Sequence, residues 1–462
     1  MELVESPGSR SEMNAPEPKV IKMYAAREDI YPREIKGRYT SLRWLCLWLT
    51  QLVFYGFAWL TWNGRQALLF DLATRKFYIF GLVLWPQDFI YLAALLIACA
   101  WGLFLVTAVA GRVWCGYSCP QTVYTEMFLW IERKFEGQRS AQMRLKKSPW
   151  NVDKIWRKGG KHAAWLALAL WTGFTFVGYF TPIRSLAHET LTLNFGPWEW
   201  FWVGFYSLAT YGNAGWLREQ VCKYMCPYAR FQSAMFDRDT LIITYDEKRG
   251  EPRGRDTTGS CIDCSLCVQV CPTGIDIRKG LQYECIGCAA CIDACDIVMD
   301  KIEQPRGLIC YDTDRAMHGG GHARLLRPRV IIYTTALTLF VTAVFTTLWL
   351  RTPLKVDVIR DRGSMGREVE DGMIENVYRL QVMNTSEQAH NYRIRATGID
   401  SLAVVTEDVV QVRATETLAV PVRLRMKHGA ADHGSHKISF ELTATDDPAL
   451  SVKENAVFIV PR

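Results

Sequence analysis

Two tandem runs of cysteine with the same spacing restrict the local fold of this chain more than any other feature. The first run reads Cys261-x-x-Cys264-x-x-Cys267-x-x-x-Cys271, followed by Pro272, and the second repeats the spacing from Cys285 to Cys295. This is the ligand pattern of a ferredoxin with two [4Fe–4S] clusters, in which the fourth Cys of each run binds the cluster of the other run. We therefore predict two sets of cluster ligands: Cys261, Cys264, Cys267 and Cys295 for one cluster, and Cys285, Cys288, Cys291 and Cys271 for its partner.

Zinc and disulfide bonds are the alternatives for these eight thiols. A zinc site would use only four of them. A disulfide framework is typical of a small secreted domain, whereas this chain has 462 residues. The pattern therefore favours iron–sulfur clusters, which move single electrons.

Five apolar stretches are close to the ~20 residues that a helix needs to cross a bilayer. They run from about 41 to 62, 88 to 110, 162 to 182, 197 to 216 and 329 to 350. The composition agrees, because 49% of the residues are hydrophobic although 22% are charged, a mixture expected of spans joined to soluble parts. The fourth stretch contains Glu199 and Asn213, which leaves a partly re-entrant helix open. The sequence thus predicts a bundle of about five transmembrane helices.

The distribution of Lys and Arg predicts the orientation of these spans. Many of them lie between the second and third stretches, whereas the loop after the third stretch has little beyond Arg184. The positive-inside rule then places the amino terminus and the cysteine runs in the cytosol, and exports everything after Arg351. We expect a multi-pass protein of a bacterial inner membrane, surrounded by membrane lipid. The net charge of +7 forms no basic patch of the kind that binds nucleic acid, so no nucleic-acid partner is expected.

The exported tail alternates apolar and polar residues, as in Leu418, Val420, Val422 and Leu424. Alternation of period two predicts strands, and the tail has the length of an immunoglobulin-like β-sandwich. The fold expected is a multi-domain membrane protein with a double-cluster ferredoxin insert. Its parts are residues 1–39 (cytosolic segment), 40–217 (four membrane helices), 218–327 (ferredoxin domain), 328–350 (fifth transmembrane helix) and 351–462 (periplasmic sandwich).

A second set of cysteines occurs in a repeated C-x-Y-x-C-P motif, once after the second stretch and once after the fourth. The set comprises Cys115, Cys119, Cys222 and Cys226. Pro favours the first position of a helix, so the stretches 123–135 and 229–236 are expected to be helical, with Cys119 and Cys226 at helix amino termini. There the helix dipole would stabilise a thiolate. The four thiols could bind copper as Cu(I), hold a further iron–sulfur cluster or cycle as dithiols. The alternative is ordinary packing of small apolar side chains, which we prefer for Cys46, Cys99 and Cys310.

Histidines give weaker signals. His428, His433 and His436 lie in one loop of the tail and could hold copper, although such a loop is more often solvated. His188 and Glu189 lie in an outer loop, where a proton acceptor for quinol chemistry is conceivable.

The arrangement resembles the FixG/RdxA/CcoG family of cytochrome c oxidase accessory proteins. The resemblance rests on five spans, paired CxxxCP motifs, the double ferredoxin run and the exported tail, and it extends to short stretches such as 30–33, 236–242, 274–278 and 358–362. It implies a role in assembling a cbb3-type haem–copper oxidase, with cupric reductase activity. Copper ions and oxidase maturation factors or subunits would then be the partners. The resemblance implies the ferredoxin cysteines as cluster ligands and the repeated cysteines as membrane-face thiols.

Three functions therefore compete: a membrane-bound reductase that converts Cu(II) to Cu(I), a quinol-to-partner electron relay of the membrane ferredoxin type, and an oxidase assembly scaffold without catalysis. The sequence names no electron donor and leaves open whether the protein forms a homo-oligomer.

Overall fold

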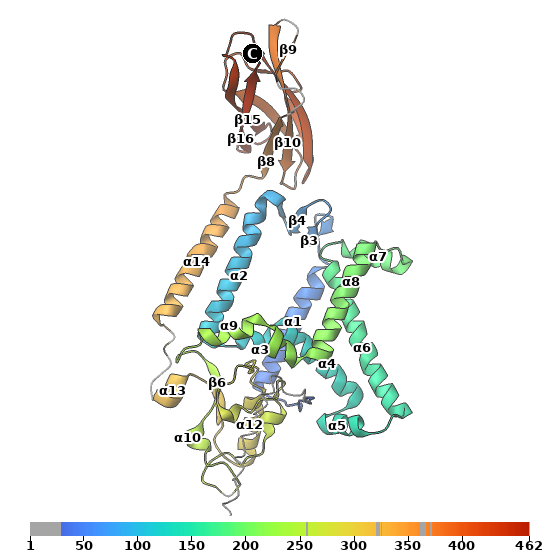
Figure 1. Ribbon diagram of the computed structural model, residues 1–462, viewed down its shortest axis with the longest axis vertical. Coiled ribbons are helices and arrows are strands. Elements are labelled where there is room, and N and C mark those ends of the chain that lie inside the picture. The colour runs from blue at the N-terminus through green and yellow to red at the C-terminus, as the bar shows by residue number, and fades with distance from the viewer. Residues whose placement is uncertain are drawn as a thin grey trace, which may run out of the picture.

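A computed structural model describes residues 29–255, 257–319, 324, 326–360, 366–369 and 372–461. Residues 1–28, most of the expected cytosolic segment, lie outside the described part of the chain. The molecule is elongated, with a β-sandwich at one end, long helices in the middle and the cysteine-rich insert at the other end (Figure 1). The insert and the sandwich thus lie at opposite ends of the helices, the arrangement that a membrane between them would require.

The long helices lie close to the stretches expected from the sequence. They are α1 (Arg38–Phe57), α2 (Phe89–Ala110), α6 (Val152–Val177), α8 (Pro197–Thr210) and α14 (Pro328–Trp349). Of the helices described, the two that are long and apolar enough to cross a membrane are Pro86–Ala110, which includes α2, and α14. The expected five-span bundle is therefore supported for two helices. The sequence explains two of the other three helices: α6 begins with charged residues, and α8 has only 14 residues.

Two of the expected spans have other boundaries. The first was expected to reach Trp62, but α1 ends at Phe57, and Thr61–Trp62 is strand β1, paired with β2 (Arg65–Gln66). Asn63 and Gly64 turn between the strands with φ of 46° and 77°, a conformation that Asn-Gly favours. The third span was expected from His162, but α6 begins at Val152, since the Asn151 side chain accepts a hydrogen bond from the Lys154 backbone N–H at 2.8 Å and caps the helix.

The outer end of the helices carries a small sheet that the sequence analysis did not predict. It consists of β3 (Leu68–Asp71), β4 (Lys76–Ile79) and β5 (Leu82–Leu84), followed by a 3₁₀ turn at Pro86–Asp88. Helix α7 (Ile183–Thr192) lies at the same end (Figure 1). The sandwich rests on this region, where the buried Asp88 carboxylate accepts from Arg351 at 2.6 Å and from Lys355, and Arg65 pairs with Glu387 at 2.7 Å.

Shorter helices occupy the opposite end. Those next to the long helices are α3 (Val113–Tyr117), α4 (Pro120–Glu136), α5 (Arg139–Lys147) and α9 (Pro227–Met235), with two π-helical stretches, η2 (Tyr211–Leu217) and η3 (Val221–Met225). The insert contains β6 (Ile242–Tyr245), α10 (Glu247–Gly250), α11 (Leu266–Gln269), η4 (Ile277–Lys279), α12 (Ala290–Lys301), β7 (Ile309–Asp312) and α13 (Asp314–Gly319). Strands β6 and β7 pair antiparallel, so the two ends of the insert meet before the chain enters α14.

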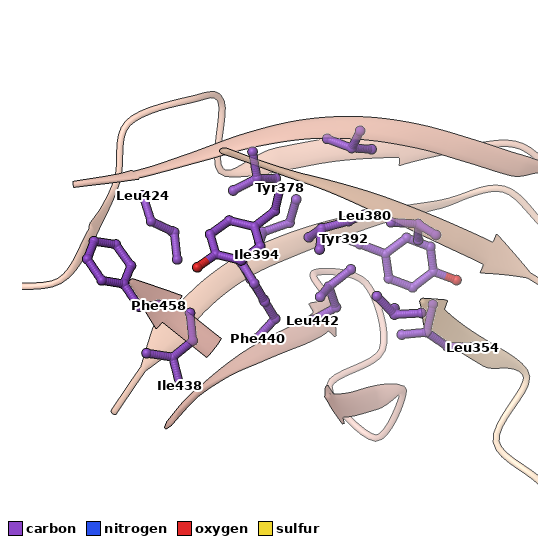
Figure 2. Close-up of a cluster of buried hydrophobic side chains, with 14 of the residues drawn as sticks. Leu354, Tyr378, Leu380, Tyr392, Ile394, Leu424, Ile438, Phe440, Leu442 and Phe458 are labelled. Atoms are coloured by element: carbon purple, nitrogen blue, oxygen red, sulfur yellow. The ribbon is translucent and has the colours of Figure 1, made fainter. Parts of the chain in front are cut away.

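The tail forms the expected immunoglobulin-like sandwich. One sheet contains β12 (Ala403–Val404), β14 (Thr417–Lys427), β10 (Met373–Asn384) and β8 (Leu354–Arg360), with β9 (Arg367–Val369) on β10. The other contains β13 (Val409–Val412), β11 (His390–Thr397), β15 (Gly434–Ala444) and β16 (Ser451–Val460). Between the sheets the Tyr378 and Phe440 rings meet edge to face at 5.1 Å (Figure 2). Alternate residues of each long strand face this core, so the period-two pattern is confirmed.

Candidate metal centre

The thiols of the insert surround two adjacent cavities. One cavity, beside β6, α11 and α12, is lined by four cysteines: Cys261, Cys264, Cys267 and Cys295. The other is lined by Cys271, Cys285, Cys288 and Cys291, together with Cys267. Cys267 lines both cavities, so the two cavities are adjacent and share this residue as part of their walls. In each cavity, three thiols of one run meet the fourth Cys of the other run, which is the grouping proposed above for two clusters.

These cavities fit an iron–sulfur cluster by the chemistry of their donors. Each offers four thiols, and the rest of its lining is largely apolar, as with Ile243 and Ile286 in the second. Among the residues that the structure describes, no three or more Cys, His, Asp or Glu side chains converge closely enough to hold one metal ion. A single zinc ion would need thiolates at about 2.3 Å from one point. The thiols stand around a space instead, as a cube of iron and sulfur between them would require.

Burial controls the protonation of these thiols. It raises the pKa of Cys267 to about 11 and the pKa values of Cys285 and Cys295 to about 12. Neutral thiols are therefore stable in the protein without metal. Because a metal binds the thiolate, loading either cavity must release protons.

Cys119 and Cys226 both cap helices that begin with proline. Cys119 precedes Pro120 at the start of α4, and Cys226 precedes Pro227 at the start of α9, so both helices expected after the CxxxCP motifs are confirmed. The stabilisation of a thiolate expected at Cys119 is present, but a larger effect opposes it in the metal-free protein. Burial raises the pKa of the Cys119 thiol and outweighs hydrogen bonds from the backbone of Thr122 and Gln121. The sequence placed the residue at a helix terminus correctly but could not show how far it is buried.

The structure brings the four repeated-motif cysteines near one another, although in the described part of the chain no three of them converge on one point where a metal ion would sit. Burial raises the pKa of Cys222 to about 12, and the neighbouring thiols Cys119, Cys115 and Cys226 act on it in the same direction. Burial likewise raises the pKa of Cys115 to about 11, with Cys119 as the next cause. The Cys115 thiol donates to Oε1 of the buried Gln232 at 3.4 Å. We call Cys115, Cys119, Cys222 and Cys226 the four-thiol centre.

The four-thiol centre lies directly against the ligand loop of the second cavity. Cys115 and Cys222 pack on a buried cluster that contains Ile286 and Cys288. At the contact, backbone meets backbone: a Cβ added to Gly116 would lie 2.6 Å from the carbonyl oxygen of Gly287. Only glycine allows this approach. The segment that carries Cys115 is therefore in direct backbone contact with the ligand loop that carries Cys285 and Cys288.

Two arginines fix this contact. The buried Arg112 guanidinium donates to the carbonyl oxygens of Cys285 at 2.9 Å and Ala229 at 2.8 Å, and so joins the cluster loop to α9. Arg43 on α1 donates to the Gly116 carbonyl at 3.3 Å and forms an ion pair with Glu126 at 3.1 Å. In the sequence, Arg112 is one of the Lys and Arg residues between the second and third stretches, and nothing there indicates the role of Arg112 or Arg43, whose partners are remote in the chain.

The other candidate residues lie elsewhere. Among the tail histidines, His433 bonds through Nδ1 to the Pro461 carbonyl at 2.5 Å, and His436 through Nε2 to the Asp432 carbonyl at 2.7 Å, while His428 is exposed. His188 and Glu189 lie on α7, at the end of the helices away from the cysteines (Figure 1). Three remaining cysteines, Cys46, Cys99 and Cys310, lie on α1, α2 and β7 and line neither cavity.

Comparisons with known protein families agree with this division of the chain. Residues 344–461 match the family described as an Ig-like fold at the C-terminus of FixG. Residues 217–258 and 251–314 match a 4Fe-4S dicluster domain, and residues 92–137, which include Cys115 and Cys119, match a 4Fe-4S binding domain.

Three curated proteins are similar over most of the chain. Protein RdxB of Cereibacter sphaeroides is 39% identical over 459 residues, which cover 94% of this chain and 96% of RdxB. Nitrogen fixation protein FixG of Rhizobium meliloti is 38% identical over 407 residues, 78% of each chain. Protein RdxA of Cereibacter sphaeroides is 40% identical over 392 residues, which cover 81% of this chain and 84% of RdxA.

Proposed function

The chain belongs to the FixG/RdxA family of iron–sulfur proteins, and from that premise we propose that it is a membrane-bound reductase that converts Cu(II) to Cu(I). The observation that carries this proposal is the contact between the four-thiol centre and the ligand loop of the second cavity. The Cu(I) would serve the assembly of a cbb3-type oxidase, with maturation factors or subunits of that oxidase as partners.

The chemistry divides between the two kinds of site. When bound, [4Fe–4S] clusters supply one electron at a time, and one electron converts one Cu(II) to one Cu(I). The four-thiol centre offers soft sulfur donors, which Cu(I) prefers. Its buried thiols give up protons as the metal binds. The buried Arg112 stands beside Cys115, Cys222 and Cys285, where its positive charge favours the thiolate form.

The orientation proposed places the insert in the cytosol and the sandwich in the periplasm. Its support is the separation of these parts at the two ends of the long helices (Figure 1) and the excess of Lys and Arg in the 112–161 segment. Copper would then be reduced at the cytosolic face of the inner membrane.

The test uses full-length protein purified without oxygen and reduced with a small excess of dithionite, which is then removed. Stepwise Cu(II) should restore the oxidised-cluster absorbance in proportion to the copper added, and a Cu(I)-specific chelator should report an equal amount of Cu(I). Replacing Cys115 and Cys222 together by Ser should leave the cluster absorbance in place and slow the Cu(II) reaction at least tenfold.

Cys99→Ser is the matched control, because Cys99 is exposed on α2, away from both cavities. It should behave as the wild type. The reductase proposal fails if Cu(II) leaves the reduced clusters of the wild type unchanged. The four-thiol centre is excluded as the copper site if the double variant reacts as fast as the control.

A further inference from the structure

A third cavity, distinct from the two cluster cavities, lies where α4, α6 and η2 meet. It has a volume of about 210 Å³. Its walls include His162, Trp165 and Trp216, and the segment from Asp29 to Tyr31 closes one side. None of these residues belongs to the metal centre described above.

The aromatic wall of this cavity is fixed in place. The His162 ring stacks on Trp216 with ring centres 5.7 Å apart and an angle of 18° between the planes. Nδ1 of His162 shares a hydrogen bond of 2.9 Å with the Tyr211 hydroxyl, and Trp165 donates to the Phe128 carbonyl at 2.9 Å. A flat ring could therefore lie against a rigid flat surface.

One wall is made by a π-helical stretch, η2, which continues α8 from Tyr211 to Leu217. Such stretches are rare and are frequent at functional sites. Gly215 within it faces the cavity, and a Cβ added there would lie 3.1 Å from the Trp165 ring. The missing side chain therefore lets the Trp165 ring pack closely against the π-helical stretch, which holds this wall of the cavity in place.

The opposite wall carries buried ionisable groups. Lys161 lies between two buried carboxylates, at 2.7 Å from Glu136 and 3.3 Å from Glu132, and Arg218 pairs with Glu132 at 2.7 Å. Around the cavity as a whole, four carboxylates face four Lys or Arg side chains: Asp29, Glu132, Glu136 and Glu219 against Lys146, Lys158, Lys161 and Arg218. Buried ionisable groups beside membrane helices are costly and usually mark a path for protons or charge. A neutral ligand that releases protons suits such a balanced site.

The cavity leads to the metal centre. Arg218 and Glu219 line it and also line a smaller neighbouring cavity, whose other walls include Cys222 of the four-thiol centre and Thr273, two residues after Cys271. The two cavities therefore share Arg218 and Glu219 as lining residues, with Trp216 on the side of the larger cavity and Cys222 on the side of the smaller one.

We propose that this cavity binds the ring of a membrane hydroquinone and is the site of its oxidation. This inference rests on the proposed function for the destination of the electrons. A hydroquinone fits because it is a single flat ring that dissolves in the bilayer and releases protons as it gives up electrons. It becomes a quinone by losing two electrons and two protons. The protons pass to the carboxylates that line the cavity and then to water, and the electrons, one at a time, reduce two Cu(II) to two Cu(I).

The test uses full-length protein in lipid nanodiscs, with decylubiquinol as the electron donor and decylubiquinone as the binding probe. Decylubiquinol should bleach the oxidised clusters of the wild type without any copper present. Binding of decylubiquinone is measured by the quenching of tryptophan fluorescence. Trp216→Leu should weaken this binding at least tenfold. Glu136→Gln should retain binding and slow the bleaching, with a changed pH dependence. Trp156→Leu is the matched control, because Trp156 is 75% exposed near the start of α6 and does not line the cavity, and it should match the wild type.

A measurement on the unaltered protein guards against misfolded variants. A photoreactive azidoquinone should label peptides from α4, α6 or η2, and excess decylubiquinone should prevent the labelling. The inference is overturned if dithionite bleaches the clusters but decylubiquinol does not, or if the label falls elsewhere. Bleaching by decylubiquinol with no later reaction with Cu(II) would uphold this inference and refute the reductase proposal, so the two can fail separately.

Discussion

Gly116→Ala tests whether the contact between the four-thiol centre and the cluster loop is a structural constraint. The added Cβ would lie 2.6 Å from the Gly287 oxygen and 3.0 Å from Cys288 Cα. A relaxed carbon–oxygen contact is about 3.3 Å, so the two segments must separate by about 0.7 Å. Both sides of the contact are backbone, and no side-chain rotation can relieve it.

The expected cost follows from two opposing effects. Overpacking of this kind costs about 1–3 kcal/mol, whereas Ala in place of Gly inside a helix gains up to about 1 kcal/mol. We expect a net loss of about 1–2 kcal/mol. At about 2–4 °C per kcal/mol for a large domain, the temperature at which the cluster absorbance is lost should fall by about 2–8 °C. The variant should also react more slowly with Cu(II), because electron transfer weakens steeply with separation.

Gly159→Ala is the matched control. Gly159 is exposed in α6, and a Cβ there would meet nothing within 4 Å, so the exchange should be neutral or slightly stabilising. Loss of cluster absorbance on heating is followed for both variants, together with the rate of reoxidation by Cu(II). If Gly116→Ala matches Gly159→Ala in both measurements, the close contact does not constrain the structure and the reasoning is refuted.

Two further predictions concern the sandwich. Asp88→Asn removes the carboxylate between Arg351 and Lys355 and should cost about 3–5 kcal/mol. Trypsin should then cleave the chain after α14 faster than in the wild type. An unchanged cleavage rate would contradict the inference that the buried ion pairs of Asp88 hold the sandwich on the helices. Burial acts to raise the pKa of the Glu375 carboxyl. Hydrogen bonds and charges from Arg367 and Arg425 outweigh burial and lower the pKa below its usual 4.5. This stabilisation is present at neutral pH and is lost as the pH falls through the lowered pKa. Glu375→Gln should therefore be less stable at pH 7 and lose less stability on acidification, as thermal unfolding would show. If the wild type and Glu375→Gln lose the same stability on acidification, the lowered pKa of Glu375 does not contribute to the stability of the sandwich.

Much of the fold could be predicted because the signals for its long helices and strands come from residues that are close together in the sequence. Alternation of apolar residues predicted which residues of β14 face the core, and the uncharged stretch after Arg329 predicted α14 to within a residue. Pro120 and Pro227 marked the first residue of their helices. These signals depend only on neighbours in the chain, and periodicity reports them well.

The missed features depend on short elements or on distant partners. Strands β1 to β5 have two to four residues each, too few for an alternation to stand out, although Asn63-Gly64 was a signal for the hairpin turn. The fourth stretch was expected to run as one helix to 216, but regular α-helix ends at Thr210. Gly212 and Gly215 lie in the π-helical part that follows, and the close packing of the Trp165 ring on Gly215 depends on a partner about 50 residues away, which the sequence did not indicate.

The same limit explains why a cysteine pattern can predict what a site binds more readily than how the site works. Spacing alone grouped the thiols, because a cluster needs a fixed number of donors at fixed reach. It could not show that burial keeps the Cys115 and Cys119 thiols protonated before metal binds. Nor could it show that Gly116 contacts Gly287. The two glycines are far apart in the chain, and the spacing of the cysteines in one motif carries no information about the position of the other motif. The contact between two motifs that the sequence treats as independent is therefore the part of the mechanism that only a structure could supply.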